Sequence, residues 1–86
     1  MWCTNLEVAM PTVIRLGDIK IVIYADDHNP PHFHIITAVY KASVELETLA
    51  IVAGFVPRQV YEVATAWALD HMSLLRDTWA KLNDRN

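Results

Sequence analysis

Three of the four histidines in this chain fall within seven residues, in the segment DDHNPPHFH at positions 26–34. His32 and His34 are two residues apart, so on a β-strand both side chains project from the same face. His28 lies in a loop that Pro30 and Pro31 stiffen. Imidazole binds metal ions and exchanges protons near neutral pH, so this segment is the candidate functional site.

The first hypothesis for this segment is a metal site. His28, His32 and His34, with Asp27 beside them, offer the donor atoms that a divalent transition metal ion prefers, and zinc is the ion that we favour. An open coordination position would make such a site catalytic. The spacing His-x3-His-x-His follows no general rule for metal binding, so it suggests a metal site without identifying one.

The second hypothesis is acid–base chemistry without a metal. One histidine would deprotonate a ribose 2′-hydroxyl and another would protonate the leaving oxygen. Three cationic side chains are candidates to neutralise the phosphate: Arg15, Lys20 and Lys41. Asp26 and Asp27 weigh against this hypothesis, because they would repel a nucleic-acid backbone at the same loop.

The third interpretation is structural. Histidines in a loop and at the start of a strand often only satisfy backbone groups, and an aspartate before His28 can stabilise a turn. The spacing does not decide between a structural and a functional role.

The first half of the chain has the pattern of β-strands. We expect strands at Thr12–Leu16, Ile19–Tyr24, His32 to about Val39, and Lys41–Glu47. Gly17-Asp18 suits a tight hairpin turn between the first two. Thr48–Ala53 fits either a short buried strand or a helical turn, because periodicity does not separate the two.

The second half predicts one long amphipathic helix of roughly 25 residues that begins at Pro57. We expect His71 and Trp67 to lie in the core, with a break near His71 as an alternative. On the flank of the apolar stripe, three residues are candidates for a partner interface: Tyr61, Met72 and Trp79. The predicted fold is α+β, an antiparallel meander of three to four strands packed against this helix.

Composition narrows the class of protein. The chain has 86 residues, 53% of them hydrophobic, and a net charge of −3, which disfavours a nucleic-acid partner. One cysteine, Cys3, excludes an intramolecular disulfide. The sequence has no basic and apolar leader and no apolar run that could cross a membrane, so we expect a cytoplasmic protein.

Several segments together resemble a small prokaryotic family, domain of unknown function 4160. They are Met10-Pro11-Thr12, the histidine segment, Gly54-Phe55 and Trp79, and the likeness extends to Leu82. The resemblance places the family's motif on Asp27, His28, His32 and His34. It implies an N-terminal extension at 1–9 and a single α+β domain at 10–86. It also implies a bacterial, archaeal or phage protein, often encoded in gene pairs that look like toxin–antitoxin modules, without an established activity.

The chain departs from the family pattern at two places. Val56 stands where the family has a serine or threonine that caps the helix. The helix is rich in alanine, valine and tryptophan, where the family has glutamate and arginine, and this favours a surface that binds a partner.

Three functions are therefore in competition. The first is a partner-binding component of a toxin–antitoxin pair, with the histidines as its functional patch and a protein partner or a second copy bound to it. The second is a histidine- or metal-dependent ribonuclease toxin. The third is a phage inhibitor of a host nuclease, with a negative face formed by Asp26, Asp27, Glu45 and Glu47.

Overall fold

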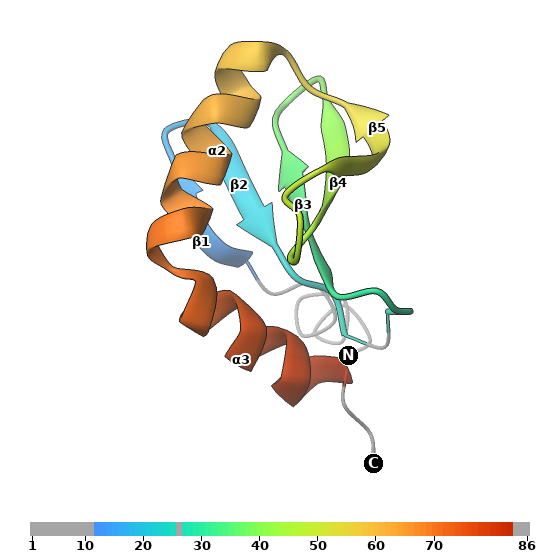
Figure 1. Cartoon of the computed structure of the whole chain (residues 1–86). Coiled ribbons are helices and arrows are strands. Elements are labelled where there is room, and N and C mark those ends of the chain that lie inside the picture. Colours follow the sequence, from blue (N-terminus) through green and yellow to red (C-terminus); the bar gives the residue numbers. More distant parts are fainter. Residues whose placement is uncertain (1–11, 26, 84–86) are drawn as a thin grey trace, which may run out of the picture.

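The fold is α+β, as predicted: a five-stranded antiparallel meander followed by two helices (Figure 1). The computed structural model describes residues 12–25 and 27–83, so the predicted extension at 1–9 lies outside the described residues. The elements are β1 (Thr12–Leu16), β2 (Ile19–Val22), β3 (His32–Ile36), β4 (Lys41–Glu45), β5 (Ile51–Phe55), α2 (Arg58–Asp70) and α3 (Met72–Asn83). The expectation of three to four strands and a single helix is wrong, because the described residues form five strands and two helices.

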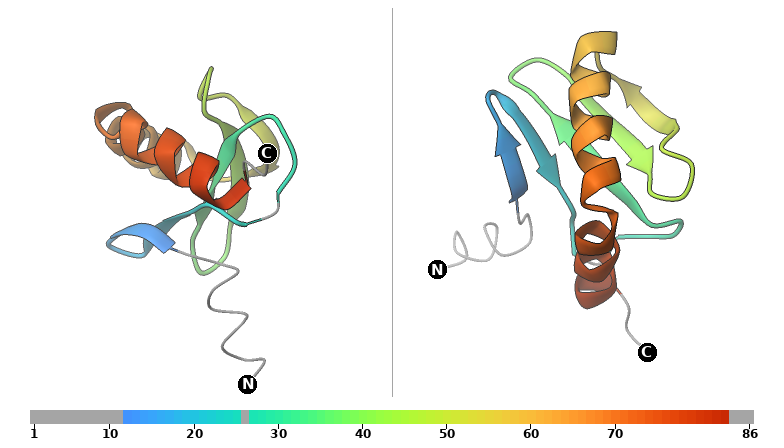
Figure 2. Two further views of the ribbon diagram at one scale, coloured as in Figure 1. Left: turned by 90° about the horizontal axis from the view of Figure 1, so that it is seen from below. Right: turned by 60° about the vertical axis from the view of Figure 1, so that its left-hand side comes forward.

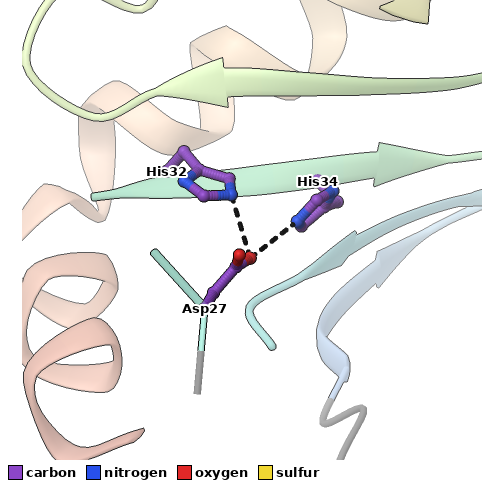
Figure 3. A group of neighbouring side chains, drawn as sticks. All are labelled: Asp27, His32 and His34. Atoms are coloured by element: carbon purple, nitrogen blue, oxygen red, sulfur yellow. Dashed lines mark hydrogen bonds and ion pairs between the residues drawn. The ribbon is translucent and has the colours of Figure 1, made fainter. Parts of the chain in front are cut away.

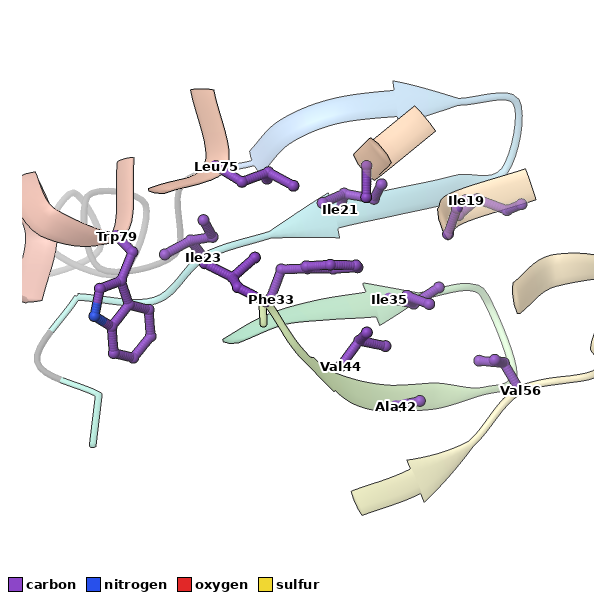
Figure 4. Packing of buried hydrophobic residues seen from close by; sticks show 13 residues of the cluster. Ile19, Ile21, Ile23, Phe33, Ile35, Ala42, Val44, Val56, Leu75 and Trp79 are labelled. Carbon is purple, nitrogen blue, oxygen red and sulfur yellow. The ribbon is translucent and has the colours of Figure 1, made fainter. Parts of the chain in front are cut away.

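Helices α2 and α3 both lie on one face of the sheet (Figures 1 and 2). Among the described residues no helix covers the opposite face, which we call the open face. Alternation along the strands explains this arrangement, because every second side chain points to the helices. In β3, Phe33 and Ile35 are fully buried, and their neighbours on β4, Val44 and Ala42, are buried with them (Figure 4). β3 therefore turns His32, His34 and Ile36 to the open face.

The predicted long helix is broken at His71. The His71 backbone N–H donates to the Ala68 carbonyl at 3.1 Å. The His71 ring Nδ1 donates a hydrogen bond to the Trp67 carbonyl at 2.8 Å. The side chain thus replaces the backbone bond that would have continued the helix. The His71 ring is exposed and stacks on Trp67, with 4.1 Å between ring centroids, so its expected place in the core is wrong.

The break redirects α3 past the end of the sheet, where Leu75 and Trp79 complete the core (Figure 4). At the other end of the helical layer, the N-cap residue of α2 is Pro57, which makes no side-chain cap hydrogen bond. Val56, at the position where the family resemblance implies a capping residue, is buried in the core. None of the helices in the described ranges is long and apolar enough to cross a membrane.

The segment at 48–53, which fits a short buried strand or a helical turn, contributes residues from Ile51 on to a strand, β5, at the edge of the sheet. This strand is exposed along its whole length, so the expected burial is wrong. Its Gly54 has φ +79° and lies opposite Ala42. A Cβ atom at Gly54 would collide with the Lys41 carbonyl oxygen and lie 2.9 Å from the Ala42 Cα. Only glycine permits this close approach of β5 to β4.

Gly54→Ala is therefore expected to destabilise the protein more than Gly17→Ala. Gly17, in the β1–β2 turn, also has a positive φ of +66°, but a Cβ there would meet nothing within 4 Å. Both variants bear the conformational cost of about 1–2 kcal/mol, and only Gly54→Ala adds a backbone collision. Urea unfolding of the two variants measures the difference, and equal losses of stability would contradict the close approach of β5.

Candidate metal centre

The Asp27 loop is held in place by the last residue of α3. The side-chain amide of Asn83 donates to the Tyr24 carbonyl at 3.0 Å, and its oxygen accepts the Asp27 backbone N–H. A single side chain thus fixes both ends of a short loop that lies 56 residues earlier in the chain. This interaction brings the Asp27 carboxylate up to the start of β3.

Two histidine rings converge on one oxygen of that carboxylate (Figure 3). His32 Nε2 lies 3.0 Å from Asp27 Oδ2, and His34 Nε2 lies 3.3 Å from the same atom. The three residues each offer one metal-ligating atom, and these atoms all lie within 4.8 Å of one another. The structure therefore assembles two imidazoles and one carboxylate that could hold a metal ion.

The opposite ring nitrogens are also occupied. His32 Nδ1 lies 2.8 Å from the Pro30 carbonyl oxygen, and His34 Nδ1 lies 3.2 Å from Ser43 Oγ. A carbonyl only accepts hydrogen bonds, so His32 Nδ1 carries a proton and the neutral ring turns a lone pair to Asp27. A metal ion bound by His32 Nε2 and Asp27 Oδ2, which lie 3.0 Å apart, would satisfy this lone pair and the carboxylate together.

Aromatic neighbours hold the two rings against rotation. His32 is only 6% exposed, and its ring centroid lies 5.1 Å from that of Trp79 on α3. The Tyr24 ring meets His34 edge to face at 4.4 Å. The ligand geometry is therefore built before any ion arrives, which lowers the cost of ordering the site.

The charge states of Asp27 and His34 suit metal binding. Burial by itself raises the pKa of Asp27, but hydrogen bonds from the His28 backbone and His34, together with the charges of His32 and His34, bring it below its ordinary value. Burial of the His34 ring lowers the pKa of His34, although its hydrogen bond with Asp27 opposes the change. At neutral pH the carboxylate is ionised and His34 is neutral, as ligands must be.

The site opens into a hollow of about 490 Å³ on the open side of the sheet. Its wall is formed by the three residues of the group together with His28, Asn29, Pro30, Ser43, Val52 and Ala53. One side of the group is therefore closed by the protein and the other is accessible to a small molecule.

His28, a predicted ligand, is not among the three residues whose ligand atoms cluster, and it contacts this group through Asp27. Its side chain is 88% exposed, and its Nδ1 faces the other oxygen of Asp27, Oδ1, at 3.2 Å. The predicted phosphate ligands Arg15, Lys20 and Lys41 lie on the same sheet face as His34, since they pair across the strands in the row next to it.

The three predicted interface residues all contact the core. Trp79 is only 7% exposed and therefore offers no free surface to a partner. Tyr61 and Met72 are half-buried and pack against the core, and the Tyr61 hydroxyl donates to the Leu49 carbonyl. An interface role for Tyr61 and Met72 stays a prediction.

The acidic face expected of a nuclease inhibitor has no free surface at Asp27, whose carboxylate contacts three histidines. Glu45 pairs with His32 across the strands, and Glu47 is exposed in the following turn. Asp26 lies outside the described residues.

Two residues of the site escape prediction from the sequence. The alternation of β4 predicts that Ser43 points outward, but only the β3–β4 register places it opposite His34. Asn83 carries no sequence signal at all, because its role depends on the turn that the chain takes at His71.

The fold and the site together define a class: a small α+β protein with two histidines and an aspartate on the open side of a helix-backed sheet. The chain belongs to the family described as a domain of unknown function (DUF4160), whose family model matches residues 18–80. No curated protein and no solved structure matches the chain.

Asn83→Ala is expected to lower the free energy of unfolding by about 1–2 kcal/mol, because it leaves two backbone groups of the Asp27 loop without partners. Lys81→Ala, at an exposed position of the same helical turn, is the control and should change stability by less than about 0.5 kcal/mol. Thermal unfolding of both variants measures the difference. Equal effects would show that Asn83 does not anchor the loop.

Proposed function

We propose that this protein binds one divalent transition metal ion, zinc in the first place, through Asp27, His32 and His34. The observation that carries the proposal is the convergence of both Nε2 atoms on one carboxylate oxygen while both Nδ1 atoms have partners of their own. Metal-bound histidines commonly donate their second nitrogen to a carbonyl or another oxygen, which fixes the tautomer.

The distances support a tetrahedral ion. Ligands at about 2.0–2.1 Å from zinc lie about 3.3 Å from one another in a tetrahedron. The two nitrogen–oxygen distances in the group, 3.0 and 3.3 Å, already match that separation. All three candidate ligand atoms lie within 4.8 Å of one another, so an ion could reach them after adjustment of the side chains.

Three protein ligands with an open side are typical of catalytic zinc sites, whereas structural sites have four. When bound, the ion would supply an activated water near neutral pH, which serves hydrolysis. The protein's own contribution is orientation: Pro30 and Ser43 hold the rings, and Asn83 holds the loop that carries Asp27. Of the competing functions, the metal-dependent enzyme therefore has the strongest geometric support.

A partner-binding role is our second proposal. Leu69 and Leu74 are exposed on the two sides of the helix break, at 65% and 46%. Exposed apolar side chains favour contact with a protein or a second copy where they form one continuous patch. Sedimentation of the purified protein over a range of concentrations tests whether the chain associates with a second copy. A toxin–antitoxin role stays a prediction from the family resemblance.

The decisive experiment measures zinc binding by the full chain without a histidine tag. At zinc concentrations one hundred times the dissociation constant, stability should rise by about 2.7 kcal/mol. His32→Ala, His34→Ala and Asp27→Asn should each abolish this increase, because each removes one of three ligands. Thermal unfolding with zinc and with chelator, together with elemental analysis, provides the readout.

His28→Ala and His71→Ala are the matched controls, since each removes an exposed histidine outside the group. Both should keep the increase in stability with zinc. If His28→Ala loses it as fully as His32→Ala does, the ligand set is wrong. If the unmodified protein neither contains nor responds to a metal, the proposal fails.

A further inference from the structure

The open face of the sheet carries a row of cations beside the candidate metal centre. Arg15 pairs with Lys20 across β1 and β2, Lys20 pairs with Ile36, and Ile36 pairs with Lys41. Directly paired residues of an antiparallel sheet point to the same face. Since His34 lies two residues from Ile36 on β3, this row runs alongside the histidines.

The row is available to a ligand. Arg15 and Lys41 are exposed and Lys20 is partly exposed, and within the described residues none of the three has an acidic partner within 4.0 Å. With strands about 4.8 Å apart, the row from β1 to β4 spans roughly 14 Å. A single small anion would not reach all three side chains, whereas a chain of phosphates would.

Two adjoining hollows connect the row to the metal centre. A hollow of about 210 Å³ is lined by Lys41, Tyr24 and His34, and it shares His34, Ser43 and Ala53 with the larger hollow at the metal centre. A phosphate held by Lys41 would therefore lie next to the open side of the metal centre.

An exposed aromatic side chain ends the same row. Phe55 pairs with Lys41 across β4 and β5, is 62% exposed, and meets the Tyr40 ring edge to face at 5.6 Å. Cations that follow a phosphate backbone, together with aromatic rings on which bases stack, are the two features of surfaces that bind single strands.

We infer that the open face of the sheet binds single-stranded nucleic acid, with Arg15, Lys20 and Lys41 on the phosphates and Phe55 stacked on a base. This inference names the ligand class of the proposed metal site and rests on that site for its setting, although binding itself does not require the ion. The net charge of −3 does not oppose it, because the cations are gathered on this one face. The Asp27 carboxylate is covered by histidines and would be neutralised by a metal ion.

The test is fluorescence anisotropy of a short labelled single-stranded RNA of mixed sequence, and of the same sequence as DNA, over a series of salt concentrations. The combined variant Arg15→Ala, Lys20→Ala, Lys41→Ala should bind about tenfold more weakly or worse. The slope of log affinity against log salt should fall from about −2 toward zero, since each phosphate that a cation neutralises contributes about 0.7 to it. Phe55→Ala should weaken binding without changing that slope, since stacking releases no counterions.

The control is Arg58→Ala, Arg76→Ala, Lys81→Ala, which removes the same charge from exposed positions on the helices. It should bind within about twofold of the unmodified protein. Equal weakening in the two combined variants would mean that only net charge matters and would overturn the inference. Equal binding of polyglutamate would also overturn it, in favour of an acidic protein.

Circular dichroism verifies that the variants fold. If the combined variant does not fold, the single variants Lys41→Gln and Arg15→Gln are used in its place. All arms are run with zinc and with chelator. If the nucleic acid binds in the presence of chelator and this binding depends on Arg15, Lys20 and Lys41, the inference is supported even where zinc does not bind. Zinc binding without any RNA or DNA binding leaves the proposed metal site intact and overturns the inference. A preference for RNA over DNA would support it and identify interactions with the 2′-hydroxyl groups.

Discussion

The alternation of side chains along β3 sets both the core and the site of this protein. Phe33 and Ile35 are fully buried beneath the helices, so His32 and His34 have to face the other way. A shift of one residue in register would bury both imidazoles in an apolar core and expose Phe33. The apolar core thus keeps the histidines on the open face, and the stability of the fold and the orientation of the site have the same physical cause.

The second requirement is that the helical layer reaches the end of the sheet. His71 interrupts the helix, and the redirected α3 brings Trp79 against His32 and Asn83 against the Asp27 loop. The helices therefore do more than cover the core. They hold the ring of one candidate ligand, His32, by packing, and the loop of another, Asp27, by hydrogen bonds.

The net charge of the chain is a poor guide to this surface. Acidic residues outnumber basic ones in the whole sequence, yet the sheet register gathers Arg15, Lys20 and Lys41 in one row. The electrostatic field close to the surface depends on such local groupings, because salt screens charges that lie more than about 10 Å away. The acidic composition, which counts against a nucleic-acid ligand in the sequence, carries less weight once the cations share a face.

Local patterns were enough to predict the α+β class, the shared face of His32 and His34 on β3, and the segment that holds the candidate site. They did not predict the fifth strand, since the short apolar run before Pro57 fits two structures. They also left open the break at His71, which depends on a hydrogen bond from the His71 side chain to a backbone carbonyl. That Asp27 joins His32 and His34 while His28 does not, and that Ser43 and Asn83 support them, follows from the packing of the whole chain. The Asn83 contacts span 56 and 59 residues of sequence. The contacts of Asp27 and Ser43 with the histidines are closer in sequence, but they depend on the path of the Asp27 loop and on the β3–β4 register.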